Sequence, residues 1–132
     1  MKNTIPDTSK ADLRKVWVVI AGVCGFTGVA LGAFGAHGLK DILTPGRMEI
    51  YKTGILYQLI HSVAILAIAV TGNNKLLKSA LFFLIGIILF SFSLYLYAMT
   101  GITAYAYVTP FGGVSLLVGW MLIIVITVKK EK

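Results

Sequence analysis

Four long apolar segments, almost free of charge, constrain this chain of 132 residues more than any other feature. A helix needs about 20 apolar residues to cross the hydrocarbon core of a bilayer. Three of the segments approach that length, whereas the second, near 55–70, is shorter. Thr44-Pro45 precedes it, and because Thr can cap a helix with Pro in its first turn, we expect this span to begin at residue 45. Thr109-Pro110 is the same signal before the fourth segment.

Composition favours a bilayer over water. The chain is 58% apolar and only 13% charged, whereas a soluble domain carries about 25% charged residues. Since no segment alternates like a strand, and since backbone polar groups in lipid must be satisfied internally, the spans should be helices. We therefore predict an all-α membrane protein, a four-transmembrane-helix bundle in one domain at 16–128. Its spans should lie at about 16–36, 45–70, 79–100 and 110–128, between a polar tail at 1–15, expected to be poorly ordered, and a basic tail at 129–132.

Lys and Arg predict the orientation of the bundle. The two tails and the loop between the second and third spans must share one side, and they hold nine basic residues: Lys2, Lys10, Arg14, Lys15, Lys75, Lys78, Lys129, Lys130 and Lys132. The opposite side holds three, Lys40, Arg47 and Lys52, beside two acidic residues. This imbalance predicts that both termini are cytoplasmic.

The net charge of +7 does not indicate a nucleic-acid partner, because the charges lie in short loops and tails around apolar blocks. We expect them to set topology and to attract anionic lipid headgroups. Ala33–Ala36 resembles a signal-peptide cleavage site, but the apolar stretch before it is longer than the usual 7–15 residues or so. We favour a retained first span. The single cysteine, Cys24, is interpreted as a small buried apolar residue.

Small residues recur along the first span at spacings of four and three. They fall within an arc of about 80° and so form a shallow groove on one helix face. In lipid, small residues let helix backbones approach closely, so this groove should be a packing surface, with a partner in the same chain favoured over another subunit. Its members are Ala21, Gly25, Gly28, Gly32 and Gly35. A weaker version in the fourth span, at Gly112, Ser115 and Gly119, is a candidate partner for it.

A polar stripe runs along the second span. Tyr57, Gln58 and His61 share one helix face with Gly54, and polar groups in hydrocarbon should face the bundle interior. We favour a neutral His61 that joins helices by hydrogen bonds, and we keep open a ligand-binding or proton-carrying role or, less favoured, metal binding. His37 ends the first span, where it either caps carbonyls or lies at the mouth of a cavity.

Several functional classes lack their usual signals. Apart from Glu49, in the segment Gly46–Lys52 that we place at the interface, no Asp or Glu lies within a span, although proton-driven exporters of the small multidrug type generally need a membrane carboxylate. No Ser-His-Asp set, phosphate-binding glycine loop or adequate set of metal ligands can be recognised. We therefore predict no catalytic residues, no metal and no cofactor.

Four ordered motifs resemble those of a known family, catalogued as domain of unknown function 423 or the transmembrane protein 256-like group. They are Gly32–Leu39 (GAFGAHGL), Tyr57–Ser62 (YQLIHS), Leu89–Tyr95 (LFSFSLY) and the segment from Thr109-Pro110 to Trp120. Ser62 and Phe92 depart mildly from the family pattern, where alanine and a small residue are usual. The resemblance covers residues 16 to 128 or so.

The resemblance implies a small multi-pass protein of the bacterial plasma membrane, with relatives in mitochondria, and it implies no activity. The corresponding motif positions form our candidate ligand or packing site. They are His37, Tyr57, Gln58, His61, Ser91, Ser93, Tyr95, Pro110, Gly112 and Gly113.

Three hypotheses follow. The first is a non-enzymatic membrane module that packs with membrane lipids, with a membrane-protein partner or with further copies of itself. The second is a small transporter or channel whose path is lined by histidine, tyrosine and glutamine. An enzyme that uses the two histidines in acid–base chemistry comes third, because no nucleophile–base set is visible.

Overall fold

The expected all-α bundle is confirmed by the computed structural model, which describes residues 8–129. Four stretches are long and apolar enough to cross a membrane: Thr8–His37, Pro45–Thr71, Asn74–Thr100 and Thr103–Lys129. The first two are single helices, α1 (Thr8–His37) and α2 (Pro45–Thr71). Because α1 begins at Thr8, the described part of the expected N-terminal tail is helical. Residues 1–7 and 130–132 lie outside the described residues.

The third stretch changes its winding along its length. It consists of a short 3₁₀ turn, η1 (Asn74–Leu76), the helix α3 (Leu77–Gly86), a π-helical turn, η2 (Ile87–Ser91), and the helix α4 (Phe92–Thr100). The fourth stretch is a 3₁₀ turn, η3 (Thr103–Tyr107), followed by α5 (Thr109–Lys129).

Local chemistry sets the ends of the helices. Thr44 accepts a hydrogen bond from the backbone N–H of Arg47 at 3.4 Å, and Pro45 occupies the first turn of α2. Gly72 and Gly101 end α2 and α4 with φ of 67° and 72°, a left-handed conformation that glycine adopts at little cost. The Arg47 guanidinium lies directly against Gly101, where a cation complements the C-terminal end of a helix dipole.

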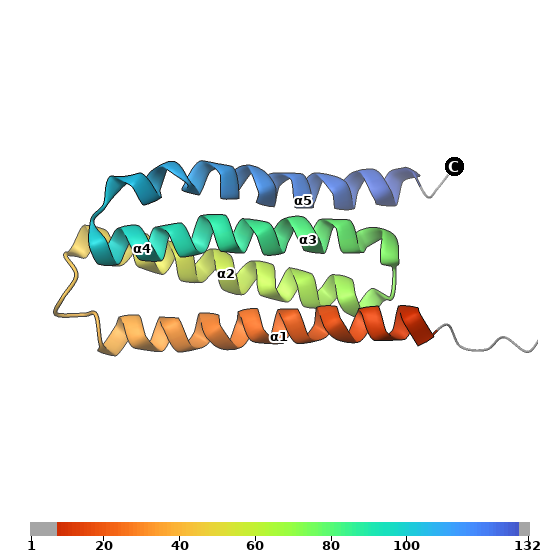
Figure 1. Ribbon diagram of the computed structural model, residues 1–132, viewed down its shortest axis with the longest axis horizontal. Helices are drawn as coiled ribbons and strands as arrows, with labels where there is room; N and C mark the ends of the chain where they lie inside the picture. Colours follow the sequence, from red (N-terminus) through yellow and green to blue (C-terminus); the bar gives the residue numbers. More distant parts are fainter. Residues whose placement is uncertain (1–7, 130–132) are drawn as a thin grey trace, which may run out of the picture.

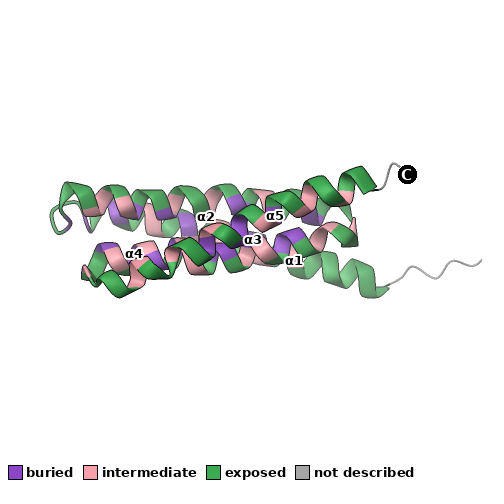
Figure 2. Cartoon of the chain, turned by 90° about the horizontal axis from the view of Figure 1, so that it is seen from above, coloured by how far each residue is buried: buried purple, intermediate pink, exposed green. Residues whose placement is uncertain are grey.

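The helices lie side by side in the order α1, α2, α3 with α4, and α5 (Figure 1). The start of α1, the α2–α3 connection and the end of α5 share one end of the bundle (Figure 1). Buried residues concentrate on the inward faces, and the outer faces are exposed (Figure 2). One core cluster surrounds Ile65, Phe83 and Leu116, and a second, near the opposite end, surrounds Leu43, Tyr51 and Tyr95.

The glycine face of α1 packs against α2. A Cβ placed on Gly28 would lie 2.7 Å from Leu59 Cδ2, and one on Gly35 would overlap the Tyr51 ring. At Gly25, by contrast, nothing lies within 4 Å of an added Cβ, so only part of the groove is filled by this chain.

The predicted pairing of this groove with the fourth span is wrong. Gly112 packs against the backbone of Leu89 and Phe90, and Gly119 packs against Phe83, so the small-residue face of α5 meets α3 and η2. Ser115 donates a hydrogen bond to the carbonyl of Phe82 at 2.7 Å in the same interface. Two small-residue faces therefore serve two separate helix pairs, because α2 and α3 lie between α1 and α5.

Candidate functional site

Gln58 joins three helices from the centre of the bundle. Its side chain is fully buried, and its Nε2 donates to the carbonyl of Cys24 at 2.8 Å and to Thr27 Oγ1 at 2.9 Å. Its Oε1 accepts a hydrogen bond from the Tyr95 hydroxyl at 2.8 Å. The amide therefore bonds α1 and α4 from its position on α2, and both its nitrogen and its oxygen have protein partners.

Two tyrosines extend this network toward the α1–α2 loop. The Tyr51 hydroxyl donates to the carbonyl of Leu31 at 2.7 Å, and the rings of Tyr51 and Tyr95 are 5.1 Å apart. Gly54 allows this contact, because a Cβ at that position would lie 2.5 Å from Tyr95 Cε1. Tyr51 thus joins two residues of the predicted stripe, Gly54 and Gln58, in contacts between helices.

His61 is bonded through both ring nitrogens. Nδ1 lies 2.7 Å from the backbone carbonyl of Tyr57, and Nε2 lies 3.1 Å from Nε1 of Trp120. A carbonyl only accepts and an indole N–H only donates, so we assign the proton to Nδ1 of a neutral ring. Protonation of Nε2 would place two N–H donors face to face. Phe83 also contacts His61 and Trp120, with centroid distances of 5.2 and 5.0 Å.

Trp120 was missing from the predicted site. In the sequence it stands out only as the end of the fourth family motif. The available signal was chemical, since an indole N–H within hydrocarbon requires an acceptor, and a histidine at similar depth on another helix can supply one. Thr27, which accepts from Gln58, was also missing, because hydroxyl side chains in membrane helices often bond their own backbone. Thr27 Oγ1 does so too, donating to Val23 at 2.8 Å.

The π-helical turn η2 shapes the contact between the third stretch and its neighbours. The backbone N–H of Phe92 bonds the carbonyl of Ile87, five residues earlier. Phe90 in this turn packs on Tyr57, with ring centroids 4.4 Å apart, and its backbone contacts Gly112. Ser91 is fully buried in the same turn. Such insertions often occur at functional sites, and the apolar pattern of this span did not reveal it.

A hollow of about 370 Å³ lies beside His61. Tyr57, His61, Phe90 and Trp120 supply aromatic walls, and Gly113 and Leu117 of α5 contribute further lining. Tyr57 is 38% exposed and Trp120 45%, so the hollow opens at the outer surface of the bundle. Tyr57 therefore lies at the edge of the polar stripe and not in its buried centre.

The remaining candidate residues do not gather around one point. Ser93 bonds the carbonyl of Phe90 at 2.9 Å and Thr109 Oγ1 at 2.7 Å, which joins α4 to α5. Pro110 is exposed in the first turn of α5. His37 is exposed at the end of α1, where backbone N–H groups of Gly38 and Leu39 bond the carbonyl of Phe34. The structure does not give His37 the predicted capping role, and the hollow beside His61 does not include it.

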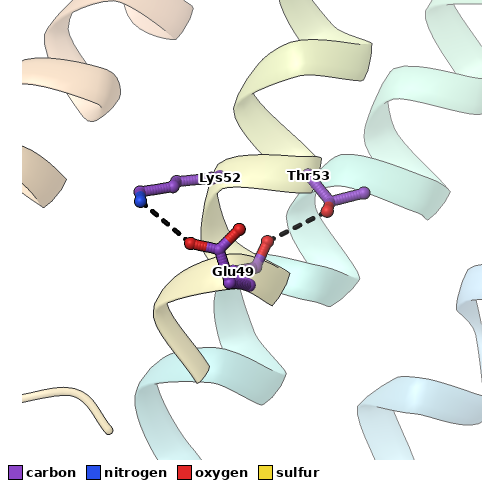
Figure 3. Close-up of polar contacts among 3 residues, drawn as sticks. All are labelled: Glu49, Lys52 and Thr53. Atoms are coloured by element: carbon purple, nitrogen blue, oxygen red, sulfur yellow. Dashed lines mark hydrogen bonds and ion pairs between the residues drawn. The ribbon is translucent and has the colours of Figure 1, made fainter. Parts of the chain in front are cut away.

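The charged residues lie apart from this interior. Lys52 and Glu49 form an ion pair at 2.9 Å on the exposed surface of α2, and Thr53 bonds the Glu49 carbonyl (Figure 3). Within residues 8–129, no group of three or more His, Cys, Asp or Glu side chains could hold a metal ion. The candidate residues are therefore suited to hydrogen bonding and aromatic contact.

These features define a small multi-pass membrane protein with a hydrogen-bonded interior. The chain belongs to the family described as protein of unknown function DUF423, whose model matches residues 31–113. The family predicted from the four motifs is thereby confirmed.

Named relatives agree with this class. The UPF0382 inner membrane protein YgdD of Escherichia coli K12 is 40% identical, over 87% of this chain and 91% of its own. The UPF0382 membrane protein YwdK of Bacillus subtilis is 34% identical, over 87% of this chain and 98% of its own. A UPF0382 membrane protein of Haemophilus influenzae is 38% identical, over 83% and 90%. No solved structure matches the chain.

Proposed function

We propose that this protein is a non-enzymatic membrane module that packs with a membrane complex or with lipid. The observation that carries the proposal is the use of Gln58 and His61 in bonds between helices. Residues that handle a substrate or a proton need polar atoms free to engage it. Here the amide of Gln58 and both nitrogens of His61 are occupied by the protein itself.

A transporter or channel is the competing function, and the same bonds argue against it. A polar path through the bundle would have to separate Gln58 from Tyr95 or His61 from Trp120. Each separation would leave unpaired polar groups in a medium without water, which is costly. The only carboxylate in the predicted spans, Glu49, is exposed and paired with Lys52 near the start of α2, which also favours the module.

The outer face of α1 is suited to contact with other membrane components. Phe26 and Val29 are exposed there, and Gly22 and Gly25 have open space where a Cβ would lie. A shallow hollow of about 510 Å³ follows this face and includes Leu59 and Val63 of α2. Small residues beside an open groove allow a neighbouring helix to approach closely.

We further propose that the protein resides in the plasma membrane of a bacterium with both termini cytoplasmic. The relatives named above include an inner membrane protein. The excess of Lys and Arg in the two tails and the α2–α3 connection supports this orientation.

Cross-linking tests the module. The protein, expressed at native level and carrying single cysteines on the outer face of α1, should co-purify in mild detergent with cross-linked membrane subunits. Gly25→Leu should abolish the cross-links without unfolding the bundle, because the added side chain enters open space. Ala30→Leu, on an exposed position of the same helix, is the matched control. A chain that stays solitary in every cross-linking experiment contradicts packing with a membrane complex, and cross-links that Gly25→Leu leaves unchanged contradict the use of this face.

Flux measurements test the competing function. Proteoliposomes under a pH gradient should show no flux above protein-free vesicles across a broad panel of ions and small solutes. Flux that is present in the unmodified protein and lost in the His61→Ala variant would contradict the module and indicate a transporter.

A further inference from the structure

The hydroxyl of Tyr57 is a polar group at membrane depth that the bundle does not use. Among residues 8–129 it forms no hydrogen bond, although the Tyr57 ring packs on Phe90 and His61. This differs from Tyr51 and Tyr95, whose hydroxyls both bond another helix. An unpaired O–H in hydrocarbon costs free energy, so the exposed edge of Tyr57 favours a partner that brings an acceptor.

The depth of Tyr57 restricts that partner. Its Cα lies about 18 Å along the helix axis from Pro45 and about 21 Å from Thr71, at 1.5 Å per residue. Lys52, which is charged and exposed, lies five residues away, or about 7.5 Å along the helix axis. In a hydrocarbon core about 30 Å thick, Tyr57 therefore lies in the half nearer the α1–α2 loop. Water and the polar groups of phospholipids lie at the surfaces of the bilayer. An acceptor for the Tyr57 hydroxyl must therefore reach several ångströms into the hydrocarbon, as the carbonyl of a molecule dissolved there does.

The hollow beside Tyr57 restricts the shape and charge of that molecule. Its volume of about 370 Å³ is at the low end of ligand pockets, which range over about 300–1,000 Å³. Aromatic rings of Tyr57, His61, Phe90 and Trp120 line it, and no charged side chain does. The polar atoms of His61 and Trp120 already bond each other, so these two rings offer faces and edges for contact. A neutral, flat, ring-sized group fits this lining.

We propose that the hollow binds the head group of a lipophilic carbonyl compound, of the chemical class of the membrane quinones. One carbonyl oxygen accepts the hydrogen bond of the Tyr57 hydroxyl, and the ring lies against the aromatic walls. The tail leaves through the open side of the hollow into the bilayer. A partner helix is the less suited occupant, because its backbone carbonyls are already bonded within the helix. The inference goes beyond the proposed function and rests on a different face of the molecule.

Tryptophan fluorescence tests the proposal. The chain has two tryptophans, so Trp17→Phe leaves Trp120, which lines the hollow, as the sole emitter. Titration of this variant in mild detergent with a short-chain benzoquinone should quench Trp120 saturably. An alkylbenzene with the same chain but no carbonyl should not displace the quinone.

Three variants then locate the site in the Trp17→Phe background. Tyr57→Phe should weaken binding about tenfold, the effect of losing one buried hydrogen bond, and it keeps the ring that packs on Phe90. Gly113→Leu should abolish saturation, because the new side chain occupies the hollow. Gly22→Leu, which enters open space on α1, is the matched control and should bind normally.

Two results would overturn the proposal. One is quenching that rises without saturation and is equal in all variants. That result would mean that the quinone only partitions into the micelle. The other is a Tyr57→Cys variant that cross-links a partner polypeptide while the quinone does not bind. Because the module is tested by Gly25→Leu and this site by Gly113→Leu, failure of either proposal is distinguishable from failure of the other.

Discussion

The indole N–H of Trp120 donates a hydrogen bond to Nε2 of His61 across 3.1 Å and so joins α5 to α2. The other ring nitrogen, Nδ1, bonds the carbonyl of Tyr57, and these two bonds together hold the imidazole in one tautomer. A histidine near the middle of a membrane helix is thereby accommodated without a charge. The pair also forms part of the wall of the hollow beside Tyr57.

Removing this bond should destabilise the bundle modestly. Trp120→Phe keeps an aromatic ring against Phe83 and His61 but removes the donor, so we expect a loss of about 0.6–1.7 kcal/mol, as for hydrogen bonds between membrane helices. Reversible unfolding in mixed detergent micelles would measure it. A double-mutant cycle with His61→Ala should show coupling of similar size, and additive effects would contradict the bond.

Gln58 should matter more than any other polar residue in the interior. Gln58→Leu removes bonds to Cys24, Thr27 and Tyr95 and leaves the Tyr95 hydroxyl buried without this acceptor. We expect a loss of about 2 kcal/mol in the same unfolding assay. Tyr95→Phe removes a single bond together with its donor, leaving only Gln58 Oε1 without a partner, and should cost less. An equal loss in both variants would mean that the α1 contacts of Gln58 contribute little.

Glycines should differ in their tolerance of alanine according to the space above them. A Cβ on Gly112 would overlap the backbone of Phe90, which cannot move aside as a flexible side chain can, so Gly112→Ala should cost about 1–3 kcal/mol. Gly25→Ala, at an open position, should be neutral or slightly stabilising. Thermal unfolding of the two variants in one detergent would compare them. Equal stability would contradict close packing of α5 on η2.

The proposed orientation predicts which loops are accessible from outside the cell. In a Cys24→Ala background, a cysteine at Ala104 in η3 should react with a membrane-impermeant maleimide in intact spheroplasts. A cysteine at Asn73, in the α2–α3 connection at the other end of the bundle, should react only after the membrane is opened. The reverse pattern would place both termini outside.

Much of the fold could be predicted from local properties of the chain. Span length and hydropathy identified four helices, because a bilayer tolerates few alternatives to a long apolar helix. The Thr-Pro pairs at 44–45 and 109–110 coincide with the starts of α2 and α5. Thr44 caps its helix as predicted, because capping depends on neighbours in sequence, whereas the Thr109 hydroxyl bonds Ser93 of α4. The π-helical turn η2 was not predicted, since hydropathy does not register one extra residue in a turn.

The amino-acid sequence by itself determined the class of protein, the family and the polar residues that must be accommodated at membrane depth. Tertiary structure alone decided the partners of those residues: α1 against α2, α5 against α3, Gln58 with Tyr95, and His61 with Trp120. The reason is physical. Hydrophobicity places every span in the bilayer equally well, whereas pairing depends on which small faces and hydrogen-bonding groups meet at the same depth.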